Sequence, residues 1–100
     1  MQIPRPDGRR PWPHLYDAVV GTLREGGFIV GVFAPVHVDV DSSSRYKPVV
    51  LSMEPSSDEE IGRVLDCLAA GNIHPEMSRA TAEVSLRKGL TVAMIHTPRQ

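Results

Sequence analysis

Hydrophobic residues alternate with other residues along GGFIVGVFAPVHVDVD, which runs from residue 26 to residue 41. Because a strand places successive side chains on opposite faces, the even-numbered residues share one apolar face. The other face is apolar as far as Phe33 and polar from His37 onward, which predicts that only its second half contacts water. Pro35 has no amide hydrogen to donate, so we expect a bend or bulge there, at a sheet edge. The predicted apolar face consists of Phe28, Val30, Val32, Ala34, Val36, Val38 and Val40.

Two shorter segments, 48–54 and 90–96, alternate in the same way and predict two further strands. The connection over residues 42–47 is polar and too short for a parallel crossover, so the first two strands are expected to form an antiparallel hairpin. The apolar faces of these two strands are Val49, Leu51 and Met53, and Leu90, Val92 and Met94, with Ala93 and Ile95 on the opposite side of the last strand.

Helical spacing of apolar residues predicts three helices, over 13–25, 58–70 and 75–88, and a glycine follows each of them. The second helix has the clearest start, because Ser57 and Glu60 form the S-x-x-E capping box. The third is predicted to begin at Pro75, since proline is tolerated in the first helical turn.

The predicted order is therefore helix, strand, strand, helix, helix, strand. It indicates an α+β fold in which helices pack on a small antiparallel or mixed three-stranded sheet. Residues 1–12 contain three prolines and three arginines with little to bury, and we expect them to form a flexible arm. Residues 13–97 are expected to form a single domain, followed by a short C-terminal tail at 98–100.

Composition narrows the classes of function. The chain has 100 residues, a net charge of −1 and one cysteine. Near-balanced charge offers no strong field toward nucleic acid or an anionic membrane, and no apolar run approaches the roughly 20 residues of a membrane span. One cysteine excludes an internal disulfide and fits a reducing compartment. We therefore expect a cytoplasmic protein of a bacterium or its mobile elements, with no cofactor and no membrane partner.

His37, Asp39 and His96 are the candidate metal ligands. This pattern resembles the H-x-D…H motif of the double-stranded β-helix oxygenases, and the resemblance implies a facial triad binding non-haem Fe(II) in a metal-dependent enzyme. Such barrels need about eight strands, whereas this chain supplies three predicted ones. We expect His37 and Asp39 to lie on the wet face of a half-exposed strand, with no metal bound. Cys67, inside the capped helix, is expected to be a small buried hydrophobic residue.

Two consecutive helices raise the alternative of a DNA-binding transcriptional regulator that uses the helical pair at 58–88. The second helix carries four residues suited to phosphates or base edges: Arg79, Ser85, Arg87 and Lys88. Three acidic residues open the first helix and would repel a DNA backbone facing it. Nucleic-acid binding is therefore the alternative rather than the main prediction.

The second face of the sheet leaves two possibilities. Its apolar residues are Ile29, Phe33, Val50, Ala93 and Ile95. Either the first helix covers them in a three-layer sandwich, or they form an exposed patch of the kind that marks a protein interface. The second possibility predicts a small non-enzymatic regulatory protein acting by contact with a protein partner or by homodimerisation, such as an anti-CRISPR-type inhibitor encoded by a phage or mobile element. The predicted contact residues are Arg10, Trp12, Ile29, Phe33 and Ile95.

Overall fold

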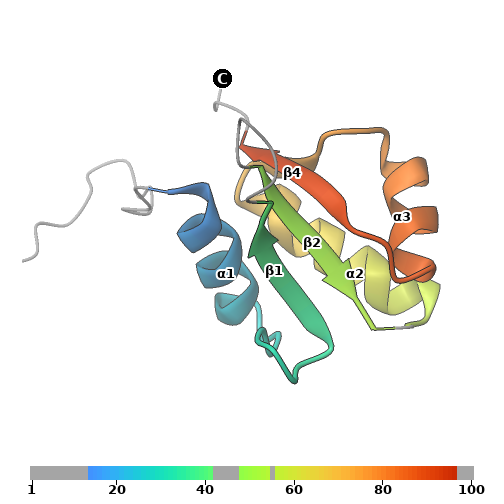
Figure 1. The fold of residues 1–100 in the computed structure, drawn as a ribbon, viewed down its shortest axis with the longest axis horizontal. Helices are drawn as coiled ribbons and strands as arrows, with labels where there is room; N and C mark the ends of the chain where they lie inside the picture. The colour runs from blue at the N-terminus through green and yellow to red at the C-terminus, as the bar shows by residue number, and fades with distance from the viewer. Residues whose placement is uncertain (1–13, 42–47, 55, 97–100) are drawn as a thin grey trace, which may run out of the picture.

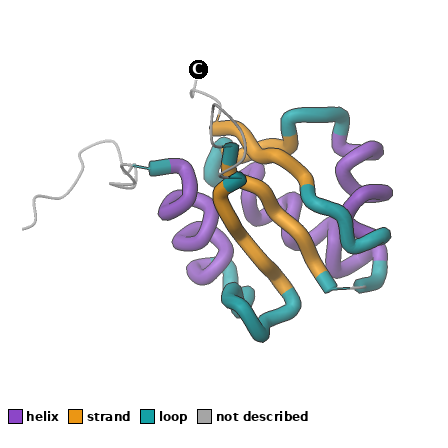
Figure 2. Tube along the Cα trace, viewed as in Figure 1, coloured by secondary structure: helices purple, strands orange, loops and turns teal. Residues whose placement is uncertain are grey.

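The computed structural model describes residues 14–41, 48–54 and 56–96. These residues form three helices and four strands, and Figures 1 and 2 show how the elements are arranged. None of the helices in these ranges is long and apolar enough to cross a membrane. In chain order the elements are α1 (Leu15–Glu25), β1 (Val36–Val40), β2 (Val49–Met53), α2 (Asp58–Ala70), β3 (Ile73–Pro75), α3 (Arg79–Arg87) and β4 (Val92–His96).

The strands form one antiparallel sheet in the order β1-β2-β4-β3. β1 and β2 are the predicted hairpin, with Val38 opposite Leu51. β4 lies between β2 and β3, so the last strand of the chain is central rather than peripheral. The α+β class is confirmed, but the sheet has four strands where the sequence pattern predicted three.

The fourth strand is β3, in a segment where the sequence predicted the start of a helix. Pro75 pairs opposite Met94 at the edge of the sheet, where a residue without an amide hydrogen disrupts no ladder. The helix begins later, after Ser78, whose hydroxyl accepts a hydrogen bond of 3.3 Å from the amide of Thr81. The element order is therefore helix, strand, strand, helix, strand, helix, strand, and α2 and α3 are not joined by a simple turn.

β1 is shorter than predicted, because the chain is a folded loop from residue 26 to residue 35. Gly27 has a φ of 92°, in the left-handed region that favours glycine, and it turns the chain out of α1. Val30 then forms an isolated parallel bridge with Val36, so the loop returns on itself before the strand begins. The predicted continuous apolar face is wrong here: Val32 is exposed, although Val30 and Ala34 are buried.

All three helices contribute to a single core on one face of the sheet. In Figure 1 the strands lie in front of α2, so the view is onto the opposite face. Ala18, Val19 and Leu23 of α1 join this same core, so the three-layer sandwich does not form. The sheet residues of the core are Val36, Val49, Leu51, Met53, Ile73, Val92 and Met94.

The N-terminus of α2 follows the predicted capping box in part. The Ser57 hydroxyl accepts a hydrogen bond of 3.2 Å from the amide of Glu60, while the Glu60 carboxylate pairs with Arg63. Replacing Ser57 by alanine is expected to lower the free energy of unfolding by about 1 kcal/mol, because one amide of the first turn loses its acceptor. Urea denaturation measures the loss. Ser57→Asp supplies another acceptor and should retain the stability; equal losses in both variants would contradict the capping role.

Candidate functional site

The loop between α1 and β1 exposes three large apolar side chains within five residues. Ile29 is 72% exposed, Val32 is 81% exposed and Phe33 is 101% exposed. We call these three residues the apolar loop tip. Isolated hydrophobic residues are ordinary on a protein surface, whereas a contiguous group is characteristic of a contact site. Two members, Ile29 and Phe33, were predicted contact residues; Val32 was not, because its position in the alternation assigned it to the core.

Buried neighbours and hydrogen bonds hold this loop in place. Val30, which lies between Ile29 and Val32, and Ala34, which follows Phe33, are buried and fix the loop at two points. The amide of Gly31 donates to the carbonyl of Val36 at 3.2 Å, and the amide of Ala34 donates to the carbonyl of Gly31 at 3.3 Å. The Arg24 guanidinium also donates to the carbonyl of Val30, at 3.4 Å. The tip is therefore presented in a defined conformation.

The face of the sheet opposite the core is a second exposed surface, which we call the open face. The strand registers place on it His37, Asp39, Val50, Ser52, His74, Ala93 and Ile95. Its apolar centre is small, and Ile95 is its most exposed large hydrophobic residue. None of the described helices packs on this face, since all three belong to the core on the other side.

The predicted contact residues do not form one patch. Ile95 lies near the start of β2, because the preceding residue Met94 pairs with Val49. The loop tip adjoins the opposite end of the hairpin, where Val36 pairs with Met53. Ile29 and Phe33 belong to the loop rather than to a strand face. Arg10 and Trp12 lie outside the described residues.

The three candidate iron ligands are not brought together. His37 and Asp39 share the open face. His96 continues the register of Val92 and Met94, which face the core, so it lies on the other face of the sheet. The imidazole Nε2 of His37 is instead 3.8 Å from the Glu54 carboxylate. Among residues 14–41, 48–54 and 56–96 no group of three His, Cys, Asp or Glu side chains is arranged to hold a metal ion.

Two of the four predicted nucleic-acid contacts are engaged in ion pairs between α3 and α2. Arg79 donates to Asp66 at 2.6 Å and to Glu83 at 3.1 Å, and these hydrogen bonds raise the pKa of its guanidinium. Arg87 pairs with Asp58 in the first turn of α2. Ser85 is half-buried and Lys88 is exposed at the end of α3. The arginines therefore tie the two helices together and are partly neutralised by the acids opposite them.

Cys67 lies between α2 and α1. Its thiol is positioned to donate to the carbonyl of Thr22, with the sulfur 3.4 Å from the oxygen. Burial and, to a lesser degree, the negative charge of Glu25 raise the pKa of the thiol. Because only the thiolate is a strong nucleophile, this environment suits a packing role better than a catalytic one.

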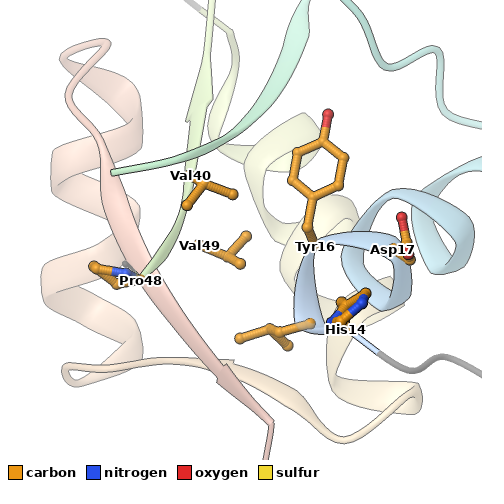
Figure 3. Close-up of a pocket in the computed structure, with 7 residues that line it drawn as sticks. His14, Tyr16, Asp17, Val40, Pro48 and Val49 are labelled. Carbon is orange, nitrogen blue, oxygen red and sulfur yellow. The ribbon is translucent and has the colours of Figure 1, made fainter. Parts of the chain in front are cut away.

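A groove of about 620 Å³ opens where the first turn of α1 faces the end of the β1–β2 hairpin (Figure 3). We call it the hairpin-end groove. His14, Tyr16 and Asp17 come from the helix side, and Val40 and Val49 from the two strands. No sequence pattern indicates this groove, because its lining comes from segments that meet only through tertiary packing. The full lining is His14, Leu15, Tyr16, Asp17, Val40, Pro48 and Val49.

Comparisons of the chain with protein-family models, with curated proteins and with solved structures find no match.

Proposed function

We propose that this chain is a small non-enzymatic regulatory protein that acts by contact with another protein, and that the apolar loop tip is the centre of the contact. The observation that carries the proposal is the exposure of Ile29, Val32 and Phe33 on a loop that is otherwise held in place. Because these apolar side chains remain in water, they contribute little burial energy to the fold, and a role in folding alone does not account for their position.

The energetics favour binding at this loop. Burying a large apolar side chain contributes about 1.5–3 kcal/mol relative to leaving it exposed. Interface energy is concentrated in a few such side chains at the centre of a contact. Because Val30 and Ala34 already anchor the loop, a partner would pay little additional entropy to order it.

The non-enzymatic part of the proposal is supported by the separation of the candidate chemical groups. His37 and Asp39 are on the open face, His96 has the core-facing register, and Cys67 packs between two helices. An inhibitor encoded by a phage or mobile element is one class of protein that works by such contacts without catalysis, and we retain it as the proposed class.

Replacing Phe33 by serine tests the proposal. The variant should weaken capture of the partner from a lysate of the source organism by at least about tenfold, which corresponds to about 1.4 kcal/mol. Its free energy of unfolding should change by less than about 0.5 kcal/mol, because Phe33 is a surface residue. Quantitative pull-down with the wild-type chain as reference measures the first effect, and urea denaturation the second.

Leu90→Ser is the matched control, since Leu90 is another exposed apolar residue of a loop, before β4. It should leave capture unchanged. If Leu90→Ser and Phe33→Ser weaken capture equally, or if neither does, the loop tip is not the contact. Light scattering at micromolar concentration distinguishes a foreign partner from a second copy: a dimer that dissociates in Phe33→Ser identifies the same loop as a homodimer contact.

A further inference from the structure

We propose that the hairpin-end groove is the docking site of the chain's own N-terminal arm, residues 1–12, with the indole of Trp12 seated between α1 and the hairpin. This inference concerns a different surface from the apolar loop tip, and it does not depend on the proposed function. It assigns an intramolecular role to Trp12, which the sequence analysis placed among the partner contacts.

Trp12 is close in sequence to a residue that lines the groove. His14 lines the groove, and Trp12 precedes it by two residues. Two residues of extended chain span at most about 7 Å, so the groove is within reach of the Trp12 side chain. The apolar loop tip adjoins the opposite end of β1, where Val36 pairs with Met53.

The chemistry of the lining also suits an indole. Leu15, Val40, Pro48 and Val49 supply apolar surface, which suits the large apolar body of an indole. A buried indole also needs an acceptor for its N–H. Asp17 is also a lining residue of this groove. The lining therefore combines apolar surface with a polar residue.

The first turn of α1 begins without a side-chain cap. His14 is the N-cap residue, with an extended backbone, and its side chain makes no capping hydrogen bond. Where a cap of this kind is lacking, a hydrophobic contact between the preceding chain and the first turns can fix the direction in which the chain enters the helix. Trp12 against the hairpin would supply such a contact.

The arm and the rest of the chain carry net charges of opposite sign. The arm carries three arginines and one aspartate, a net charge of +2, which leaves −3 for the rest of a chain whose total is −1. Asp17 is one of the residues that line the groove. Arg9 and Arg10 follow Trp12 outward along the arm, so docking brings opposite charges together.

Trp12 is the only tryptophan of the chain, so the full-length protein reports on its own docking. We expect its fluorescence emission at a shorter wavelength than that of free N-acetyl-tryptophanamide, and a Stern–Volmer constant for acrylamide several-fold lower. Val40→Ser and Tyr16→Ala, each at a partly exposed lining residue, should shift the emission toward the free value and raise the quenching constant. Val84→Ser is the matched control, because Val84 is a similarly exposed valine on α3, away from the groove.

Circular dichroism melts confirm that each variant is folded before its emission is read. Emission of the wild-type chain equal to that of the free amide overturns the proposal. A shielded Trp12 that responds equally to the Val84 control and to both groove variants also overturns it. Shielding that increases with protein concentration, together with a larger mass in light scattering, assigns the groove to the arm of a second copy and overturns docking within one chain.

Discussion

Replacing Met94 by alanine is expected to lower the free energy of unfolding by about 2–5 kcal/mol, because it removes a long side chain from a closed core. Met94 is 1% exposed on the central strand β4 and belongs to the core formed by all three helices. For a domain of this size, a loss of 1 kcal/mol lowers Tm by about 4–8 °C. The Met94→Ala variant should therefore melt at least about 8 °C below the wild-type chain.

Ile95→Ala is the matched control one residue further along the same strand. Ile95 is 38% exposed on the open face, so its truncation removes fewer contacts and leaves no closed cavity. We expect a loss below about 1 kcal/mol, within the range of ordinary surface substitutions. Urea denaturation of both variants, analysed with a common slope, measures the difference. Equal losses at the two positions would mean that the sheet is covered on both sides, contrary to the two-layer arrangement.

Local signals explain what the sequence could predict. At the start of α2 the Ser57 hydroxyl accepts a hydrogen bond from the amide of Glu60, three residues later. Because both residues are close in sequence, this pair predicts the start of the helix without knowledge of the rest of the fold. The β1–β2 hairpin follows equally from alternation and a short connection. The division of β4 into core-facing Val92 and Met94 and outward-facing Ile95 also follows from a period of two.

The errors come from residues that suit two structures. Pro75 is acceptable in the first turn of a helix and at the edge of a sheet, and only the pairing of β3 with β4 decides between them. Alternation across 28–35 similarly fits a strand or a loop whose buried and exposed side chains happen to alternate. Val32 lies outward there because Val30 bridges to Val36, a contact that spacing alone does not reveal.

The candidate site was predictable only in part for the same reason. Alternation identified Ile29 and Phe33 as contact residues because it placed them on the outer face of a strand. In the structure these positions belong to a loop. The hairpin-end groove had no local signal, because it forms where α1 meets two strands. The sequence pattern left open which face of the sheet α1 covers. The contact between Gly26 and Cys67 provides a direct test of the position of α1.

Replacing Gly26 by alanine is expected to lower the free energy of unfolding by about 1–3 kcal/mol, the usual cost of overfilling a packed contact. Gly26 caps α1 with a φ of −80°, which alanine adopts without strain. The cost arises elsewhere, because a Cβ at this position would collide with the Sγ of Cys67 on α2. Without that collision, the change would stabilise the chain by about 0.4–1 kcal/mol through its effect on the unfolded state.

A double-mutant cycle isolates this contact. In a Cys67→Ala background the sulfur is absent, so Gly26→Ala should become neutral or slightly stabilising, and the coupling between the two sites should lie within about 0.5–3 kcal/mol. Gly31→Ala is the control: nothing lies within 4 Å of a Cβ built there, and its effect should be the same in both backgrounds. Urea denaturation of the wild-type chain and the five variants provides every term. If the cost of Gly26→Ala does not change when Cys67 is removed, α1 does not pack against α2 at this contact. The single core would then be wrong, and the open face, the loop tip and the groove all depend on that core.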